Sequence, residues 1–177
     1  AVSYLDNLYD KQPDTWYHYY FKALMELKEF SKAEKITKKQ LRANKYNVQY
    51  NVYLGKIYKA EGSTKKEKEA YEKAIKDLTP IQPFILNLAN AFIEDQLFDY
   101  AIEVYVKAAK ATPEYPYFYE KAEIYKLKGN TLAMINEYLD ALDFRDSELE
   151  TIQMHLQNSL GYDDQEGGIK NPLLKQE

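Results

Sequence analysis

This 177-residue chain has 28 acidic residues, which we expect mainly on solvated helix faces, but few of the other side-chain types that catalyse reactions or bind metals. There is no cysteine, and the two histidines, His18 and His155, lie far apart in the sequence. The short patterns of zinc hydrolases, serine hydrolases and glycine-rich phosphate loops do not occur. Asp163 and Asp164 do not continue into a calcium-binding loop. We therefore expect a non-catalytic protein that uses no metal and no cofactor.

Side chains suited to binding are easier to identify. Asn87 and Asn90 are spaced so that both amides project from one side of a helix. A carboxamide can donate and accept hydrogen bonds at once, so it can pair with the backbone of an extended peptide. These two asparagines are the strongest single binding candidates. Their surroundings depend on the elements that position them.

A period of 33 or 34 residues runs through the chain and defines those elements. Small and aromatic residues recur in fixed phase, as three series: Ala74, Ala108 and Ala141; Tyr71, Tyr105 and Tyr138; Gly55, Ala89 and Ala122. Such a period is typical of stacked helical hairpins, each unable to bury its apolar face alone.

The bends inside these hairpins have local signals. Gly62 and Gly129 stand where a left-handed residue would end the first helix of a pair. Lys28 and Gln96 occupy the corresponding bends without glycine, so those two turns should differ slightly.

Capping signals stand at the start of two second helices. Ser31 with Glu34, and Thr64 with Glu67, match the capping box, in which a hydroxyl and a carboxylate satisfy free backbone amides.

These features resemble the tetratricopeptide repeat, whose pattern is W-x₂-L-G-x₂-Y, then A-x₃-F, then P. The matching residues in the second to fourth repeats are Leu54, Gly55, Tyr58, Tyr71, Ala74 and Pro80; Leu88, Ala89, Phe92, Ala101, Tyr105, Ala108 and Pro113; and Ala122, Tyr125, Gly129, Tyr138 and Ala141. The first repeat is more divergent: Trp16 stands at its start, and Ala33 fits an alanine position of the pattern. The resemblance covers about residues 14–142.

Three residues depart from that pattern. Glu67 and Met134 replace the small alanine at a helix contact, and Lys121 replaces the usual leucine. The aliphatic part of Lys121 could lie over apolar surface. The resemblance implies an all-α, right-handed superhelical solenoid of antiparallel helix hairpins. First helices would line a concave groove that binds peptides or protein segments.

The predicted organisation follows from the repeats. Residues 1–12 are expected to form the second helix of a truncated preceding repeat, and residues 149–160 a capping helix or the first helix of a next repeat. Residues 161–177 read as a flexible linker and the start of a helix that is cut off, so we expect a piece of a longer protein. The four repeats between them span 14–148, as 14–47, 48–81, 82–114 and 115–148.

Side chains between the core positions of the first helices should project into the groove. These candidate binding residues are His18, Lys22 and Met25 in the first repeat; Gln49, Val52, Lys56 and Lys59 in the second; Leu86, Asn87, Asn90 and Ile93 in the third; and Tyr119, Glu123 and Lys126 in the fourth. One well-known subset of the family clamps the carboxyl terminus of chaperone tails through lysine, asparagine and arginine. That set is not reproduced here, because the third repeat has no arginine.

Charge narrows the class of partner. The net charge is −4, divided as +5 over residues 1–81 and −9 over residues 82–177. An acidic chain without a basic stripe along the groove argues against nucleic acid. The second helix of the first repeat carries a run of basic residues, namely Lys32, Lys35, Lys38, Lys39, Arg42 and Lys45. This run could bind an acidic partner or an anionic membrane, or simply face solvent.

The sequence thus predicts a scaffold that binds a protein or peptide. Two alternatives stay open: a glycan-binding helical-repeat module of a cell-envelope uptake protein, and a structural segment that self-associates through exposed terminal helices. No apolar run is long enough to span a membrane. The compartment is undecided between cytoplasm and the bacterial periplasm or cell envelope.

Overall fold

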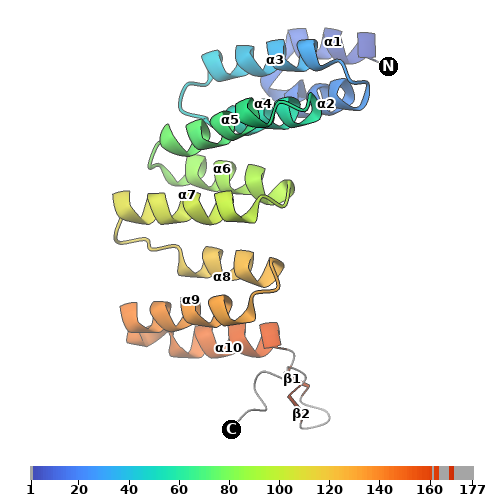
Figure 1. Ribbon diagram of the computed structural model, residues 1–177. Helices are drawn as coiled ribbons and strands as arrows, with labels where there is room; N and C mark the ends of the chain where they lie inside the picture. Colours follow the sequence, from blue (N-terminus) through green and yellow to red (C-terminus); the bar gives the residue numbers. More distant parts are fainter. Residues whose placement is uncertain (1, 161, 164–167, 170–177) are drawn as a thin grey trace. The chain divides into compact units, whose positions relative to one another are not determined.

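The computed structural model describes residues 2–160, 162–163 and 168–169, and helices account for most of them (Figure 1). The prediction of an all-α protein is confirmed. The α-helices are α1 (Val2–Lys11), α2 (Pro13–Glu26), α3 (Phe30–Ala43), α4 (Tyr50–Ala60), α5 (Thr64–Lys76), α6 (Gln82–Glu94), α7 (Phe98–Ala111), α8 (Phe118–Leu127), α9 (Thr131–Phe144) and α10 (Leu149–Leu160). A short 3₁₀ helix, η1 (Asp146–Glu148), precedes α10.

The segment 161–177, predicted as a linker, contains two short strands. β1 (Tyr162–Asp163) pairs antiparallel with β2 (Gly168–Ile169), which the prediction of a flexible linker did not include. The predicted helix start at Pro172 lies outside the described residues. No helix in the described ranges has the length and apolarity needed to cross a bilayer.

The chain divides into two compact units, residues 1–115 and 116–177. In the first unit, α1 packs on α2, α2 on α3, α3 on α4, α4 on α5 and α6 on α7, while α4 also contacts α6 and α5 contacts α7. In the second unit, α8 packs on α9, and α10 packs on α9 and η1. Each segment predicted as a repeat contains one helix pair, namely α2 with α3, α4 with α5, α6 with α7 and α8 with α9.

All four hairpin bends have the same backbone structure. Lys28, Gly62, Gln96 and Gly129 have φ values of 58°, 76°, 57° and 70°. In each bend the next amide bonds to a carbonyl five residues back; for example, Glu29 N lies 2.8 Å from Leu24 O, and Leu97 N 2.9 Å from Phe92 O. This is the Schellman motif, which satisfies carbonyls that a helix end leaves free. The expectation that the Lys28 and Gln96 turns differ is therefore wrong.

Two non-glycine residues thus occupy a conformation that costs an L-residue about 1–2 kcal/mol. We expect Lys28→Gly and Gln96→Gly each to stabilise the first unit by about 0.5–1 kcal/mol, since glycine also loses more entropy on folding. Urea denaturation followed by circular dichroism would measure the gain. Leu27→Gly is the matched control because φ is −83° at Leu27, and it should destabilise. Loss of stability in Lys28→Gly would contradict the prediction.

The two predicted capping boxes do not form. Helix α3 begins at Phe30 and α5 at Thr64, so Ser31 and Thr64 lie inside the first turn instead of before it. The Schellman bend fixes the chain direction early, and each helix resumes right after its three-residue turn. A side-chain cap is present at α9, where Asn130 Oδ1 accepts from the amide of Ala133 at 3.1 Å.

The periodic residues form the core. Tyr71, Ala74 and Ala89 are buried in the first unit, and Ala122, Tyr138 and Ala141 in the second. Aromatic rings fill much of the first unit: Tyr17 meets Tyr50 edge-on at 5.0 Å, and its hydroxyl lies 2.9 Å from Thr37 Oγ1. Small residues let the helices approach while tyrosine rings fill the gaps, which explains why both types recur in phase.

The departure at Lys121 has a structural reason. Its ammonium lies 2.7 Å from Glu137 Oε2, and the two side chains are only 12% and 13% exposed. The same nitrogen lies 4.9 Å from the centre of the Phe118 ring. A charged residue therefore replaces the usual leucine because a second helix supplies its counter-charge. Met134, the other residue of this unit that differs from the repeat pattern, has its side chain buried in the core.

Candidate functional site

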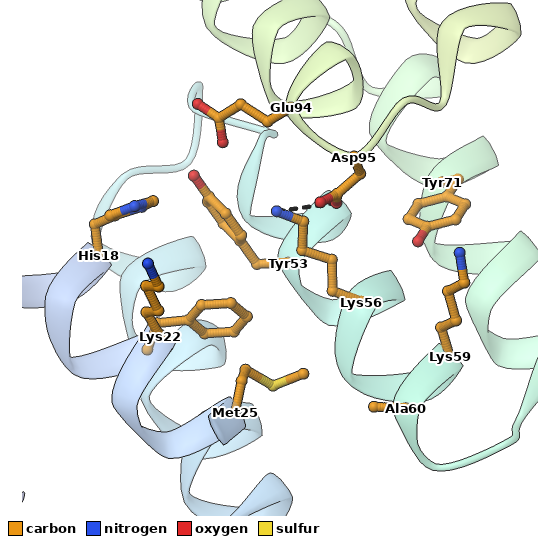
Figure 2. Close-up of a pocket in the computed structure, with 11 residues that line it drawn as sticks. His18, Lys22, Met25, Tyr53, Lys56, Lys59, Ala60, Tyr71, Glu94 and Asp95 are labelled. Atoms are coloured by element: carbon orange, nitrogen blue, oxygen red, sulfur yellow. Dashed lines mark ion pairs between the residues drawn. The ribbon is translucent and has the colours of Figure 1, made fainter. Parts of the chain in front are cut away.

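The first unit contains an open cleft of about 660 Å³ (Figure 2). Helix α2 forms one side, α4 the centre, and the end of α6 together with a ring from α5 the other side. The lining residues are His18, Phe21, Lys22, Met25, Tyr53, Lys56, Lys59, Ala60, Tyr71, Glu94 and Asp95. All of them belong to the first unit.

Buried aromatic rings form the apolar part of the cleft. The Phe21 and Tyr53 rings pack 5.1 Å apart, and Tyr71 packs edge-on against Phe92 at 5.6 Å. All three lining aromatics, Phe21, Tyr53 and Tyr71, are buried. Because core packing holds these rings, the cleft is preformed and would cost a ligand little ordering.

One lysine of the cleft is fixed by an internal ion pair. Lys56 Nζ lies 2.9 Å from Asp95 Oδ2 and 5.0 Å from the centre of the Tyr53 ring, as Figure 2 shows. Burial lowers the pKa of Lys56, and the nearby carboxylate of Glu94 opposes that shift. Asp95 is the C-cap residue of α6, so the end of α6 is joined electrostatically to α4. This pair braces the cleft and leaves little of the Lys56 charge for a ligand.

Two other lysines keep their charge available. Within the part of the chain that the structure describes, neither Lys22 nor Lys59 has an ion pair, and both are exposed. Figure 2 shows Lys22 with His18 and Met25 on the α2 side, and Lys59 across the cleft beside Tyr71. Two uncompensated ammonium groups on either side of an aromatic floor suit a ligand with both carboxylate and apolar groups.

The structure brings together five of the fourteen predicted binding residues. His18, Lys22, Met25, Lys56 and Lys59 all line the cleft. Predicted residues of the first unit outside this lining are Gln49, Val52, Leu86, Asn87, Asn90 and Ile93. Asn87 and Asn90 are exposed on α6, so their amides are open to solvent.

The prediction for Val52 is wrong. Its side chain is fully buried in the core, whereas the adjacent Tyr53 lines the cleft. Successive residues of a helix are about 100° apart, so a phase error of one position exchanges a core residue for a groove residue. The cleft face of α4 runs through Tyr53, Lys56, Lys59 and Ala60.

The predicted residues of the fourth repeat are engaged within the second unit. Tyr119 donates a hydrogen bond to Glu148 Oε2 at 2.9 Å, and Glu123 Oε1 accepts one from Tyr138 at 3.2 Å. Lys126 lies 3.8 Å from Glu123 in an exposed pair. The Tyr119 and Glu123 side chains thus tie α8 to the elements that follow it.

Sequence reasoning missed Tyr53, Glu94 and Asp95. Glu94 and Asp95 end α6, immediately after the predicted residue Ile93, whereas helical spacing points only to mid-helix positions. A helix end beside a groove is exposed and often charged, and this signal could have identified the two acids.

In the described part of the chain, no three His, Cys, Asp or Glu residues are placed to hold a metal ion. His18 belongs to the first unit and His155 to the second, where His155 stacks on Tyr138 at 5.5 Å.

The burial of Tyr53 in the cleft can be tested by the pH dependence of stability. Burial raises the pKa of Tyr53 to about 12, with the Glu94 carboxylate as a smaller cause. Folding therefore favours the neutral phenol of Tyr53 over the phenolate. The resulting stabilisation of the folded state is fully present below the unfolded pKa of about 10 and is lost as the pH rises toward 12. We expect the urea midpoint to fall between pH 10 and pH 12, and to fall less in Tyr53→Phe. Equal slopes for the two proteins would contradict this assignment.

Comparisons with known proteins leave the family assignment a prediction. No protein-family model matches the chain, and no curated protein matches it either. Function is therefore inferred from the geometry of the cleft.

Proposed function

We propose that this chain is a non-catalytic, tetratricopeptide-like scaffold that binds an extended segment of another protein. In this proposal the helix hairpins stack into a right-handed solenoid. Four identical Schellman bends and a core made of the periodic residues support it. Such a scaffold recognises its partner with a surface that is already formed.

The single observation that carries the proposal is the cleft between α2, α4 and the end of α6. Five residues selected from sequence as groove residues meet there around a rigid aromatic floor. Lys22 and Lys59 supply positive charge on its two sides. A peptide with an apolar side chain and a nearby carboxylate would satisfy both features.

The glycan alternative receives less support. Sugars stack on exposed aromatic faces, whereas the aromatic rings of the cleft, Phe21, Tyr53 and Tyr71, are buried. The exposed tyrosines among the described residues, namely Tyr4, Tyr19, Tyr46 and Tyr115, lie outside the lining of the cleft. Connections within the four hairpins are also only three residues long, which leaves no inserted loop to shape a sugar site.

Phage display would test the proposed function, because it selects ligands from a random library and needs no identified partner. A library of random twelve-residue peptides is panned on the chain, and enriched clones are rebound to a Lys22→Glu, Lys59→Glu variant. We expect enriched peptides to share an acidic residue near an apolar one, and to bind the variant at least tenfold more weakly.

A matched control makes the same change of charge elsewhere. Lys11 and Lys110 are exposed and lie outside the cleft, so Lys11→Glu with Lys110→Glu should leave binding nearly unchanged. Failure to enrich any peptide, or equal binding to the cleft variant, would refute the proposed site.

A further inference from the structure

The first unit contains a second hollow, on helices α3, α4 and α5. It encloses about 500 Å³, and its floor is apolar, formed by Leu41, Leu54, Tyr58 and Ala70. We call it the basic groove, because positively charged side chains line two opposite edges. It shares no lining residue with the cleft.

The two edges of the basic groove come from different helices. Lys38 and Arg42 belong to α3, and Lys66 and Lys73 to α5, with Glu69 as the acidic lining residue. Lys38 and Lys73 are paired within their own helices, at 2.7 Å to Glu34 and 2.6 Å to Asp77.

The remaining two cations are less compensated. Lys66 Nζ lies 5.5 Å from the centre of the Tyr58 ring, and Arg42 has no ion pair among the described residues. Residues 30–76 as a whole contain 13 Lys and Arg against 5 Asp and Glu. The basic groove is therefore built to attract an apolar segment flanked by carboxylates.

The second unit presents a surface of that kind on α9. One side of this helix has Leu132, Asn136, Leu139, Asp140 and Asp143, spaced so that all five fall on a single stripe. Leu132 is 67% exposed and Leu139 49% exposed, so the stripe carries two solvent-facing leucines seven residues apart.

The charge of the α9 stripe is negative. Neither Asp140 nor Asp143 has an ion pair in the described ranges, and residues 131–150 contain six acids against one arginine. From Leu132 to Asp143 the stripe is about 17 Å long at the rise of an α-helix.

We propose that the α9 stripe of one copy docks into the basic groove of a second copy. The two leucines meet the apolar floor, and the two aspartates meet Arg42 and Lys66. A concave groove with an apolar floor fits a helix, whereas a flat lipid surface could not reach that floor. This inference does not depend on the cleft or on its peptide ligand.

The contact joins two different surfaces, so a dimer still has one free groove and one free stripe. Association therefore continues with concentration beyond a dimer, into longer chains or closed rings. One helix in one groove is a small interface, so the assembly is weak and depends on low salt.

Sedimentation equilibrium of the full chain over a concentration series tests the proposal. In about 50 mM NaCl the weight-average mass should rise above the 20.8 kDa of the monomer, and in about 500 mM NaCl it should return toward that value. Arg42→Glu with Lys66→Glu should abolish the rise, and so should Asp140→Lys with Asp143→Lys.

A charge swap provides the decisive result. When the groove variant and the stripe variant are mixed, both contacts become complementary again, and the mass should rise although each variant alone is monomeric. Lys32→Glu with Lys35→Glu makes the same change of charge on exposed α3 positions outside the groove, and should retain association.

Three outcomes would overturn the proposal. The first is a monomer at every concentration in low salt. The second is association that persists in the groove variant or is not restored by mixing. The third is a monomer that binds phosphatidylserine vesicles through the groove residues, which would assign this surface to a membrane. Circular dichroism of each variant verifies that it is folded.

Discussion

Gly55→Ala should destabilise the first unit by about 2 kcal/mol, although alanine is the better helix former. A Cβ atom on Gly55 would overlap Cε1 of Tyr71 and lie within 2.7 Å of two further ring atoms. Tyr71 is buried against Phe92 and Tyr100, so its ring cannot move aside freely.

Two effects of opposite sign compete at this position. Replacing a mid-helix glycine by alanine gains about 1 kcal/mol of helix propensity. Overpacking a rigid core costs typically 1–3 kcal/mol and more when several atoms overlap. We expect the clash to win, because the overlapping atoms belong to a ring fixed by neighbours. Urea denaturation would show the midpoint falling by about 1 M.

The sign of the effect should reverse when the ring is removed. In a Tyr71→Leu background, Gly55→Ala should stabilise the chain by up to about 1 kcal/mol, since only the propensity gain remains. A loss of stability in both backgrounds would show that Tyr71 is not the cause.

Sequence reasoning alone does not reveal this clash. Gly55 matches the glycine of the repeat pattern, and the corresponding positions of the next two repeats hold Ala89 and Ala122. Periodicity identifies which positions face a neighbouring helix, but not how near a given ring lies. That distance depends on the packing of each hairpin.

Periodicity is nonetheless sufficient for the helical class and for the positions of the bends, although not for the backbone structure at Lys28 and Gln96. At Gly62 and Gly129 the residue type itself indicates a left-handed conformation. Lys28 and Gln96 are identified as bend residues only by their position in the repeat. The backbone follows the spacing because the Schellman hydrogen bonds and the packing of both helices outweigh the cost of one strained residue.

Sequence reasoning identifies only part of the candidate site. Helical spacing identifies three of the four lining residues on α2 and two of the four on α4, and it selects Val52 where Tyr53 lines the cleft. Asp95 cannot be paired with Lys56 from sequence, since the two residues lie on helices of different hairpins. Contacts between hairpins depend on how they stack, and local spacing does not determine that.

The ion pair between Lys121 and Glu137 leads to the largest expected effect in the second unit. Both side chains are nearly buried, and Glu137 Oε2 has no hydrogen-bond partner among the described residues, so the ammonium at 2.7 Å is its compensation. Lys121→Met should cost about 3 kcal/mol, because it leaves a buried carboxylate unpaired. Loss of the contact with the Phe118 ring adds to that cost.

Removal of both charges separates the two causes of that loss. Lys121→Met with Glu137→Leu should return to within about 1 kcal/mol of the wild type, because a well-packed apolar pair avoids the desolvation cost. The exposed pair of Lys126 and Glu123 is the control, and Lys126→Met should change the free energy of unfolding by less than about 0.5 kcal/mol. If the double variant is as unstable as Lys121→Met, the lysine acts through packing of its aliphatic stem and not through its charge. Recovery in the double variant would instead mean that the lysine at this leucine position is required only because Glu137 faces it.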